Sequence, residues 1–325
     1  MPYDPPAVAP AAAIRIEGAP HVEVTPHVTS LHVDLPWFPQ PYPPNVFLVR
    51  NGAHAALIDS GFSDDASYNK RIEFLAAFPD LKVAYIVLTH HHYDHASGAH
   101  RLRDATGAQI VVHKDEESLL LSPDSETGDM EIPEDQKEAR EQAKKWRAEA
   151  AKAVPDLRVE DGAVLDVGGL HLRLVHTPGH TAGHLCILLE EERLLFAGDN
   201  VLGVGTAAIA PPPHGDMSQY IQSLRKMQSL DATLLAPGHG PLVQEPNRKI
   251  QELIEHRQQR EDQIVGLIAS GRDSVKSLVK AIYPELDKRL MMMATGQVIS
   301  HLHKLQSEGK LQLEGKGAET KVRAA

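Results

Sequence analysis

The chain has 325 residues, of which 42% are hydrophobic and 24% charged, enough for one large domain with a smaller appendage. The formal net charge of −11 disfavours bulk attraction to nucleic acid as the main activity. The charge is uneven, because residues 247–325 carry 14 Lys+Arg against 10 Asp+Glu and the first 246 residues carry 19 against 34. The single cysteine, Cys186, excludes an internal disulfide and a zinc ribbon, and we interpret it as a small buried hydrophobe.

The N-terminal segment, residues 1–20, is rich in Pro and Ala and is expected to be loose. It has no basic start, and its prolines interrupt any apolar helix, so it does not have the pattern of a signal peptide. No stretch approaches 18 uninterrupted apolar residues, so no membrane span is predicted. The predicted compartment is the cytoplasm.

The first half of the chain alternates short β-like runs with helical patterns, which indicates an α/β domain. Strands are predicted at residues 28–35, 45–51, 54–61, 83–90 and 108–114, and helices at 66–78 and 96–106. Residues 133–154 are rich in Ala, Glu and Lys with a proline at the start, which predicts a helix. We interpret this helix as part of an insertion at about residues 122–158.

A second block of strands follows, and the C-terminal pattern is helical. Strand hairpins are predicted at residues 163–177 and 184–199, with a further strand at 231–240. Residues 247–271, 274–284 and 293–323 predict three helices followed by two short strands, the pattern of a winged helix-turn-helix. The predicted division is a catalytic domain at 21–246 and a C-terminal domain at 247–325.

The segment LTHHHYDHASG, residues 88–98, follows an apolar strand and is crowded with imidazoles. If it continues as an extended chain, alternation directs His90, His92 and Asp94 to one side, His91 and Tyr93 to the other, and a turn adds His95. The alternative is a histidine-rich surface turn. Three further ligand-type residues decide between the two, because His180, Asp199 and His239 each follow an apolar β run beside Gly or Pro.

Sites in α/β architectures are built outside the carboxyl ends of strands, so these segments are expected to converge. Seven ligands make two sites rather than one. We assign His90, His92 and His180 to a first metal and Asp94, His95 and His239 to a second, with Asp199 bridging. Asp59, which ends another strand, is expected to receive the second N–H of a ligating histidine.

A binuclear centre of this kind lowers the pKa of a bridging water, and the resulting hydroxide is a nucleophile at neutral pH. Asp94 is also expected to orient that hydroxide and accept its proton. The two divalent ions are expected to be zinc, with iron and manganese as alternatives. The other histidines without such a context are interpreted as ordinary: His21, His27, His32, His54, His100, His113, His171, His256, His301 and His303.

Five segments, LIDSG, THHHYDH, HTPGHT, AGDN and PGHG, occur in the order found in the metallo-β-lactamase superfamily. The chain resembles that superfamily over roughly residues 30–245. The resemblance implies an αββα sandwich of two sheets with a binuclear centre on one edge, and its ligand pattern falls on the same seven residues. It also supports Asp59 as a residue that hydrogen-bonds to a metal ligand rather than to the metal. It implies that His184 lies near the centre, although His184 can also be interpreted as a histidine with a structural role at the start of a strand.

The substrate is less defined. Asp199 stands where true β-lactamases of this class usually have cysteine, which disfavours antibiotic hydrolysis. The THHHYDH form resembles glyoxalase II, a hydroxyacylglutathione thioesterase, but the C-terminal third does not match its glutathione-binding domain. That third resembles the lactamase-beta-2-like group, which appends a winged helix and includes a single-strand endoribonuclease and fungal thioesterases acting on polyketide carriers.

Two functions are therefore weighed. The favoured one is hydrolysis of a small or carrier-bound ester or thioester, with residues 36–45 as an apolar wall or simply a packed loop, and the inserted helix as a lid. The alternative is a ribonuclease that cuts single-stranded RNA and binds it through the winged helix. If the winged helix does not bind nucleic acid, we expect it only to pack on the catalytic domain or on a partner subunit. A non-catalytic metal-binding protein would be expected to lack one or more of the metal ligands, and all seven are present. The sequence leaves open whether the chain forms a homo-oligomer.

Overall fold

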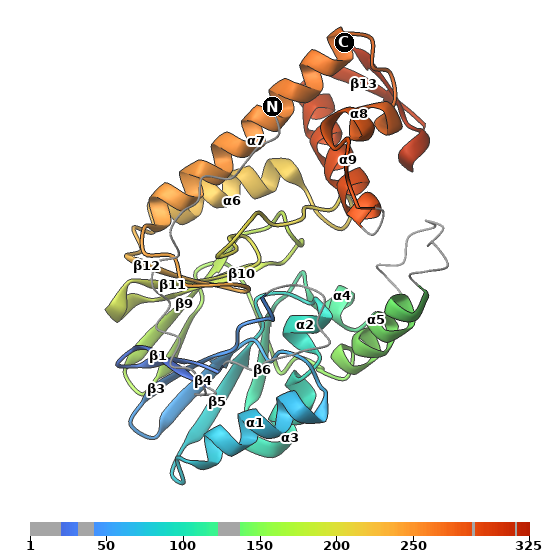
Figure 1. The fold of residues 1–325 in the computed structure, drawn as a ribbon. Coiled ribbons are helices and arrows are strands. Elements are labelled where there is room, and N and C mark those ends of the chain that lie inside the picture. The colour runs from blue at the N-terminus through green and yellow to red at the C-terminus, as the bar shows by residue number, and fades with distance from the viewer. Residues whose placement is uncertain (1–20, 32–41, 123–136, 288–289, 316) are drawn as a thin grey trace.

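Two β-sheets pack face to face with helices on their outer sides, and a helical unit follows at the C-terminus (Figure 1). The computed structural model describes residues 21–31, 42–122, 137–287, 290–315 and 317–325. The order of layers is the predicted αββα sandwich with a C-terminal winged helix, so both parts of the fold prediction are confirmed. Residues 1–20 and most of the 36–45 stretch lie outside the described residues, so the predictions for them stay predictions.

Within the described residues, the first sheet has seven strands, hydrogen-bonded in chain order. They are β1 (Val22–Thr25), β2 (Val28–Ser30), β3 (Phe47–Asn51), β4 (His54–Ile58), β5 (Lys82–Val87), β6 (Gln109–His113) and β7 (Leu157–Val159). β1 to β4 form an antiparallel meander, and β4 to β7 are parallel. Parallel neighbours need crossover connections, which here contain α1 (Asp65–Ala76), α2 (Tyr93–Ala96), α3 (Ala99–Thr106), α4 (Glu117–Leu120) and α5 (Lys137–Ala150).

In the part of the chain that the structure describes, the second sheet has five strands: β8 (Val164–Val167), β9 (Leu170–His176), β10 (Leu185–Leu189), β11 (Leu194–Gly198) and β12 (Leu234–Pro237). The predicted Gly-Gly hairpin joins β8 to β9, and both Gly168 and Gly169 adopt the positive φ that such a turn requires. β11 and β12 are parallel, joined through α6 (Met217–Ser229). Sequence reasoning had not identified α6.

Three apolar layers hold the sandwich together. The central layer combines inward-facing side chains of both sheets, for example Val87 and Val111 from the first and Leu172, Ile187 and Phe196 from the second. The first sheet packs its other face on α1 and α3, and the second packs its other face on α6 and α7 (Pro246–Ala269). Because apolar burial contributes roughly 25 cal/mol per Å², these layers are the main source of stability.

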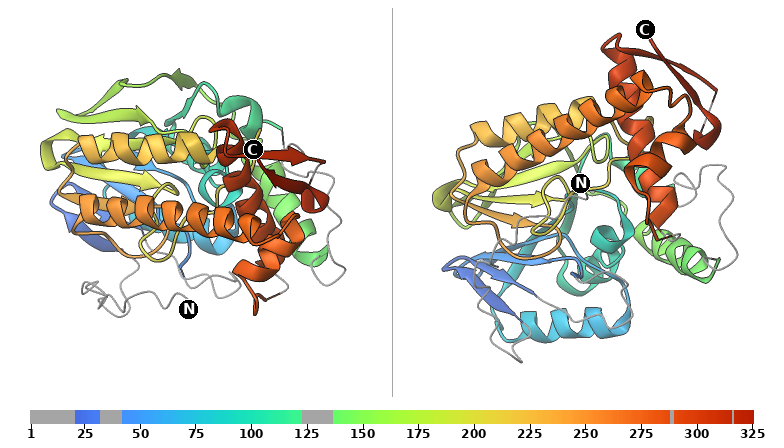
Figure 2. Two further views of the ribbon diagram at one scale, coloured as in Figure 1. Left: turned by 90° about the horizontal axis from the view of Figure 1, so that it is seen from above. Right: turned by 45° about the horizontal axis from the view of Figure 1, so that its top comes forward.

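The C-terminal unit contains the second half of α7, then α8 (Val275–Ile282), α9 (Met291–Ser307) and the antiparallel pair β13 (Leu311–Glu314) and β14 (Lys321–Ala324). Figure 2 shows α7 lying beside α6 along the second sheet before it reaches this unit. Ile250 and Leu253 of α7 belong to the apolar layer of the sandwich, whereas Ile264 belongs to the core of the C-terminal unit. The predicted division between residues 246 and 247 therefore coincides with the start of a helix that both parts share, and it stays a prediction.

The predicted inserted helix is present as α5, and residues 123–136 before it are outside the described residues. Trp146 of α5 packs edge-on against Phe62, with ring centroids 5.3 Å apart, and Phe62 in turn lies 6.1 Å from the Tyr93 ring of α2. The insertion is thus docked on the helix that follows β5. Among the described residues, no helix has the length and apolar character needed to cross a bilayer.

Candidate metal centre

The carboxyl ends of several strands from both sheets meet at one edge of the sandwich. β4 ends next to Asp59, β5 leads into the histidine segment, and β9, β11 and β12 lead into His180, Asp199 and His239. The seven residues predicted as ligands all lie there. His90, His95, His180 and His239 are buried, and His92, Asp94 and Asp199 are partly buried.

The predicted strand alternation was wrong beyond His92, although the predicted residues do lie together. The chain after β5 is not extended as far as Asp94, because α2 begins at Tyr93 with His92 in the N-cap position. The N–H groups of His95 and Ala96 donate to the carbonyl of His92, at 3.0 and 2.9 Å. The helical turn, rather than strand alternation, directs Asp94 and His95 to the same site as His90 and His92.

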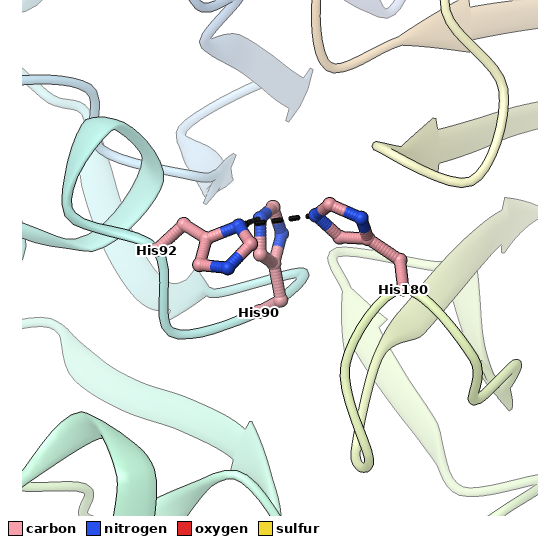
Figure 3. A group of neighbouring side chains, drawn as sticks. All are labelled: His90, His92 and His180. Carbon is pink, nitrogen blue, oxygen red and sulfur yellow. Dashed lines mark hydrogen bonds between the residues drawn. The ribbon is translucent and has the colours of Figure 1, made fainter. Parts of the chain in front are cut away.

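The first group comprises three imidazoles from two segments, shown in Figure 3. His92 Nδ1 lies 2.8 Å from His90 Nε2 and 3.0 Å from His180 Nε2. The edge of a tetrahedral zinc site with 2.0–2.1 Å bonds is about 3.3 Å, so these nitrogens are close to the spacing that one cation requires.

The second group comprises Asp94, His95 and His239. His239 Nε2 lies 3.2 Å from His95 Nε2 and 3.3 Å from Asp94 Oδ2. Asp199 lies between the groups, since its Oδ1 is 3.4 Å from His95 Nε2 and its Oδ2 is 3.9 Å from His180 Nε2. His90, His95 and Asp199 also form a ligand-sized combination, so the two groups are contiguous.

Outer hydrogen bonds fix the tautomers of three of these imidazoles. Because carbonyl oxygens only accept, His180 Nδ1 donates to the Ala208 carbonyl at 2.9 Å and His239 Nδ1 donates to the Tyr42 carbonyl at 3.0 Å. His95 Nδ1 donates to Asp59 Oδ2 at 2.7 Å. Each bond engages Nδ1 and directs Nε2 into the site, which is the arrangement of a metal-ligating histidine.

The electrostatics of the site are those of a cation site. Burial, followed by the neighbouring imidazoles of His95 and His92, lowers the pKa of His90 well below its usual value, so His90 is neutral. Burial would raise the pKa of Asp199, but His239 and His95 outweigh it and hold that pKa well below its usual range. Burial would lower the pKa values of His95 and His239, but Asp199 and the other neighbouring carboxylates outweigh it and raise both, so a divalent ion must displace protons from these two imidazoles when it binds.

A glycine lets the backbone pass close to two of the candidate ligands. Gly238 passes so close to Asp199 that a Cβ at this position would overlap Asp199 Oδ1 and crowd the His95 ring. The donor set, the spacing of the nitrogens and this close approach all fit divalent metal ions of the zinc class.

Comparison with known proteins agrees with this geometry. The family model for the metallo-beta-lactamase superfamily matches residues 39–239, and that for the beta-lactamase associated winged helix domain matches residues 274–319. The chain belongs to the metallo-β-lactamase superfamily. It is a hydrolase of that superfamily, in agreement with the sequence prediction.

Individual relatives within the superfamily match most of the chain. The beta-lactamase-like protein 2 homolog of Drosophila melanogaster is 30% identical over 272 residues, covering 83% of this chain and 84% of that protein. An atrochrysone carboxyl ACP thioesterase of Aspergillus fumigatus is 30% identical over 293 residues, covering 85% of this chain and 80% of that protein.

Solved structures of the superfamily share the fold. A beta-lactamase domain protein from Burkholderia ambifaria has a TM-score of 0.77 at 22% identity, covering 94% of this chain and 93% of that one. A metallo-beta-lactamase family protein from Thermus thermophilus has a TM-score of 0.72 at 24% identity, covering 93% and 99%. Because both coverages include the C-terminal unit, the combination of sandwich and winged helix is shared as well.

Glu116 is a buried residue of this superfamily fold that sequence reasoning missed. It lies just after β6, and its carboxylate accepts hydrogen bonds from the backbone N–H of His91 at 2.9 Å and of Gly183 at 2.8 Å. It also bonds to the His91 ring and the Thr181 hydroxyl. Burial would raise the pKa of Glu116, but His91 and these hydrogen bonds lower it to about 2. Glu116 thereby links the histidine segment to the loop that carries His180.

His184 lies beside the centre, as the resemblance implied. It is fully buried, its ring is 5.4 Å from that of His90, and its Nε2 accepts a hydrogen bond from the backbone N–H of Asp199 at 3.2 Å. Burial and the neighbouring His180 lower the pKa of His184 to about 3. A neutral His184 thus supports the backbone of Asp199.

His113, which has no ligand context in the sequence, stacks on His176 with ring centroids 3.9 Å apart and planes at 9°. Asp115 completes a ligand-sized group with these two residues. Parallel stacked rings direct their lone pairs side by side rather than at one point, so this arrangement suits packing better than chelation.

Proposed function

We propose that the protein is a binuclear metal-dependent hydrolase of an ester or thioester. His90, His92 and His180 would hold one divalent ion, Asp94, His95 and His239 a second, and Asp199 both, with zinc as the first choice. The observation that carries the proposal is the convergence of all seven residues from four separate segments. They form contiguous groups of three, and within each group the ligand atoms lie within 4.8 Å of one another.

Bound ions would supply Lewis acidity, making water acidic enough to ionise near neutral pH and polarising an acyl carbonyl. The side chains of the site supply the rest. Asp94 is partly exposed, and its Oδ2 lies 3.3 Å from His239 Nε2, so it can orient the attacking water and accept its proton. The fixed imidazoles of His95, His180 and His239 supply a pre-organised site that does not reorganise during the reaction.

Two observations favour an acyl substrate over RNA. A relative that covers 85% of the chain is named as an ACP thioesterase. In addition, several cations of the C-terminal region are paired with carboxylates, which reduces their attraction for phosphates: Arg248 with Glu245 and Glu252, Lys304 with Glu261 and Glu308, Lys310 with Glu308, and Arg323 with Glu314. We therefore favour a small or carrier-bound thioester over RNA.

The metal assignment is tested by elemental analysis of a variant in which His90 and His92 are both changed to alanine. We expect it to lose at least one of the two ions per chain, whereas His303→Ala, an exposed histidine on α9, retains both. An unchanged metal content in the folded double variant would show that the ligand assignment is wrong.

The substrate class is tested with a panel offered to the zinc- and manganese-loaded protein: acyl-glutathione and acyl-carrier thioesters, a lactone, a phosphodiester and single-stranded RNA. We expect thioester turnover to exceed all others and to be lost in the double histidine variant. RNA turnover that exceeds thioester turnover and persists in moderate salt would replace this proposal with a ribonuclease.

A further inference from the structure

The connection between β11 and α6 contains a short stretch, residues 207–210, which we call the clasp segment. It forms no helix or sheet hydrogen bonds. Its side chains alternate, with Ala207 and Ile209 buried and Ala208 and Ala210 exposed. A buried irregular segment must satisfy its backbone polar groups through side chains or water, so the partners of this backbone indicate what holds it in place.

Those partners come from the C-terminal helices. Arg257 of α7 donates from Nη2 to the Ala207 carbonyl at 2.7 Å. On α9, Gln297 Oε1 accepts the backbone N–H of Ile209 at 2.9 Å, and the hydroxyl of Ser300 donates to the Ala210 carbonyl at 3.3 Å. Figure 1 shows the connection that precedes α6 extending to α9.

The carbonyl between these contacts belongs to Ala208, and it accepts the Nδ1–H of His180 at 2.9 Å. The peptide units on both sides of Ala208 are therefore held by the C-terminal helices. The Ala208 carbonyl and the Ile209 N–H belong to one planar peptide unit, so the hydrogen bond to Gln297 fixes the direction of that carbonyl, while Arg257 holds the preceding peptide unit. Arg257 is only 2% exposed, and a charged donor makes the stronger kind of hydrogen bond.

We propose that Arg257, Gln297 and Ser300 are positioning residues for His180: through the clasp segment they orient the imidazole whose Nε2 faces His90 and His92. Helices α7 and α9 then support the metal centre without touching it. This inference rests on the proposed role of His180 as a ligand. Loss of an outer hydrogen bond to a ligating histidine lowers metal affinity by roughly 10- to 100-fold.

Gln297 allows a sharp test, because only its acceptor oxygen is used and its Nε2 makes no hydrogen bond with the described residues. Gln297→Met removes the acceptor at similar volume, and Gln297→Glu retains it. The matched control is Gln306→Met, an exposed glutamine on the same helix. The measurement is a titration of each metal-free, full-length protein with cobalt(II), followed by the visible absorption of the bound ion and by circular dichroism of the fold.

We expect Gln297→Met to bind cobalt about 10-fold more weakly with an altered absorption band, and Gln297→Glu and Gln306→Met to stay within about twofold of the unmodified protein. Equal affinity and an equal spectrum for folded Gln297→Met would overturn the inference. If Gln297→Met does not fold, Ser300→Ala takes its place and must weaken binding at least about threefold relative to Gln306→Met. Failure of the unmodified protein to bind cobalt would instead refute the ligand assignment itself.

Discussion

Asp59 Oδ2 lies 2.7 Å from His95 Nδ1 at the place where the neighbouring parallel strands β4 and β5 end. The same carboxylate accepts hydrogen bonds from the backbone N–H of Thr89 at 2.7 Å and from its hydroxyl at 2.9 Å. Asp59 is 2% exposed and has a φ of 60°, a conformation that Asp and Asn tolerate better than other side chains. A single carboxylate thus fixes both the start of the histidine segment and one proposed metal ligand.

Replacing Asp59 by Asn keeps the shape and tolerates the positive φ, but the amide cannot accept all three hydrogen bonds. We expect Asp59→Asn to lower zinc affinity by roughly 10- to 100-fold while the chain remains folded. Competition with a chromogenic chelator measures this, and Asp80→Asn, an exposed aspartate, serves as control. Affinity equal to that of the control would mean that Asp59 does not orient a ligand.

Glu116 predicts a pH dependence of stability. Its pKa falls from 4.5 to about 2 on folding, so its contribution is fully present above pH 4.5 and is lost as the pH falls from 4.5 towards 2. The shift corresponds to roughly 3 kcal/mol at neutral pH. We expect Glu116→Gln to be destabilised by about that amount in urea at pH 7, with the difference narrowing at pH 4 and pH 3.

The neighbouring Glu117 provides the control for this measurement. Its partner Arg158 is also at the surface, and exposed ion pairs contribute little. Glu117→Gln should therefore change the free energy of unfolding by less than about 1 kcal/mol. A Glu116→Gln variant as stable as Glu117→Gln at pH 7 would contradict the structural role assigned to Glu116.

Metal removal is expected to destabilise the folded chain, because ions that bind only the native state stabilise it by mass action. A free zinc concentration of 100 times Kd adds about 2.7 kcal/mol. Thermal unfolding of the chelator-treated protein, with and without added zinc, measures the effect. The variant with both His90 and His92 changed to alanine should respond less; equal responses of the two proteins would show that zinc acts elsewhere.

The docking of α5 is tested at Trp146. Trp146→Ala removes the edge-on contact with Phe62, and we expect the free energy of unfolding to fall by about 1–3 kcal/mol, since this side chain is only partly buried. Limited proteolysis should cut sooner near α5. Lys145→Ala, at an exposed position of the same helix, should leave both measurements unchanged. Equal proteolysis rates for the two variants would show that Trp146 does not hold the helix.

The seven ligand candidates could be located from the sequence because they obey one simple rule: each lies just past an apolar strand or in the segment that follows one. The carboxyl ends of such strands meet at one edge, so proximity follows from topology. The rule does not give local geometry. Alternation failed beyond His92 because helix α2 starts at Tyr93, and sequence patterns locate helix starts only within a few residues.

Glu116 also follows a strand, yet the pattern could not distinguish it from its neighbours. Asp115, Glu116 and Glu117 are three consecutive acids, which is typical of a solvated turn. Only the fold shows that Glu116 is buried while Asp115 is exposed, because the backbone N–H groups that satisfy Glu116 come from segments far away in the chain. The hydrogen bonds of the clasp segment could not be predicted from the sequence either, because its partners lie some 50 to 90 residues away in the chain.

Helix α7 has one half in the apolar layer of the sandwich and the other in the core of the C-terminal unit, so neither core is complete without it. If one unit opens locally, α7 loses the apolar contacts that it makes with that unit, although it still forms part of the core of the other. The two units are thereby bound into one cooperative unfolding transition, and slow amide exchange should extend along the whole length of α7 rather than fade towards either end.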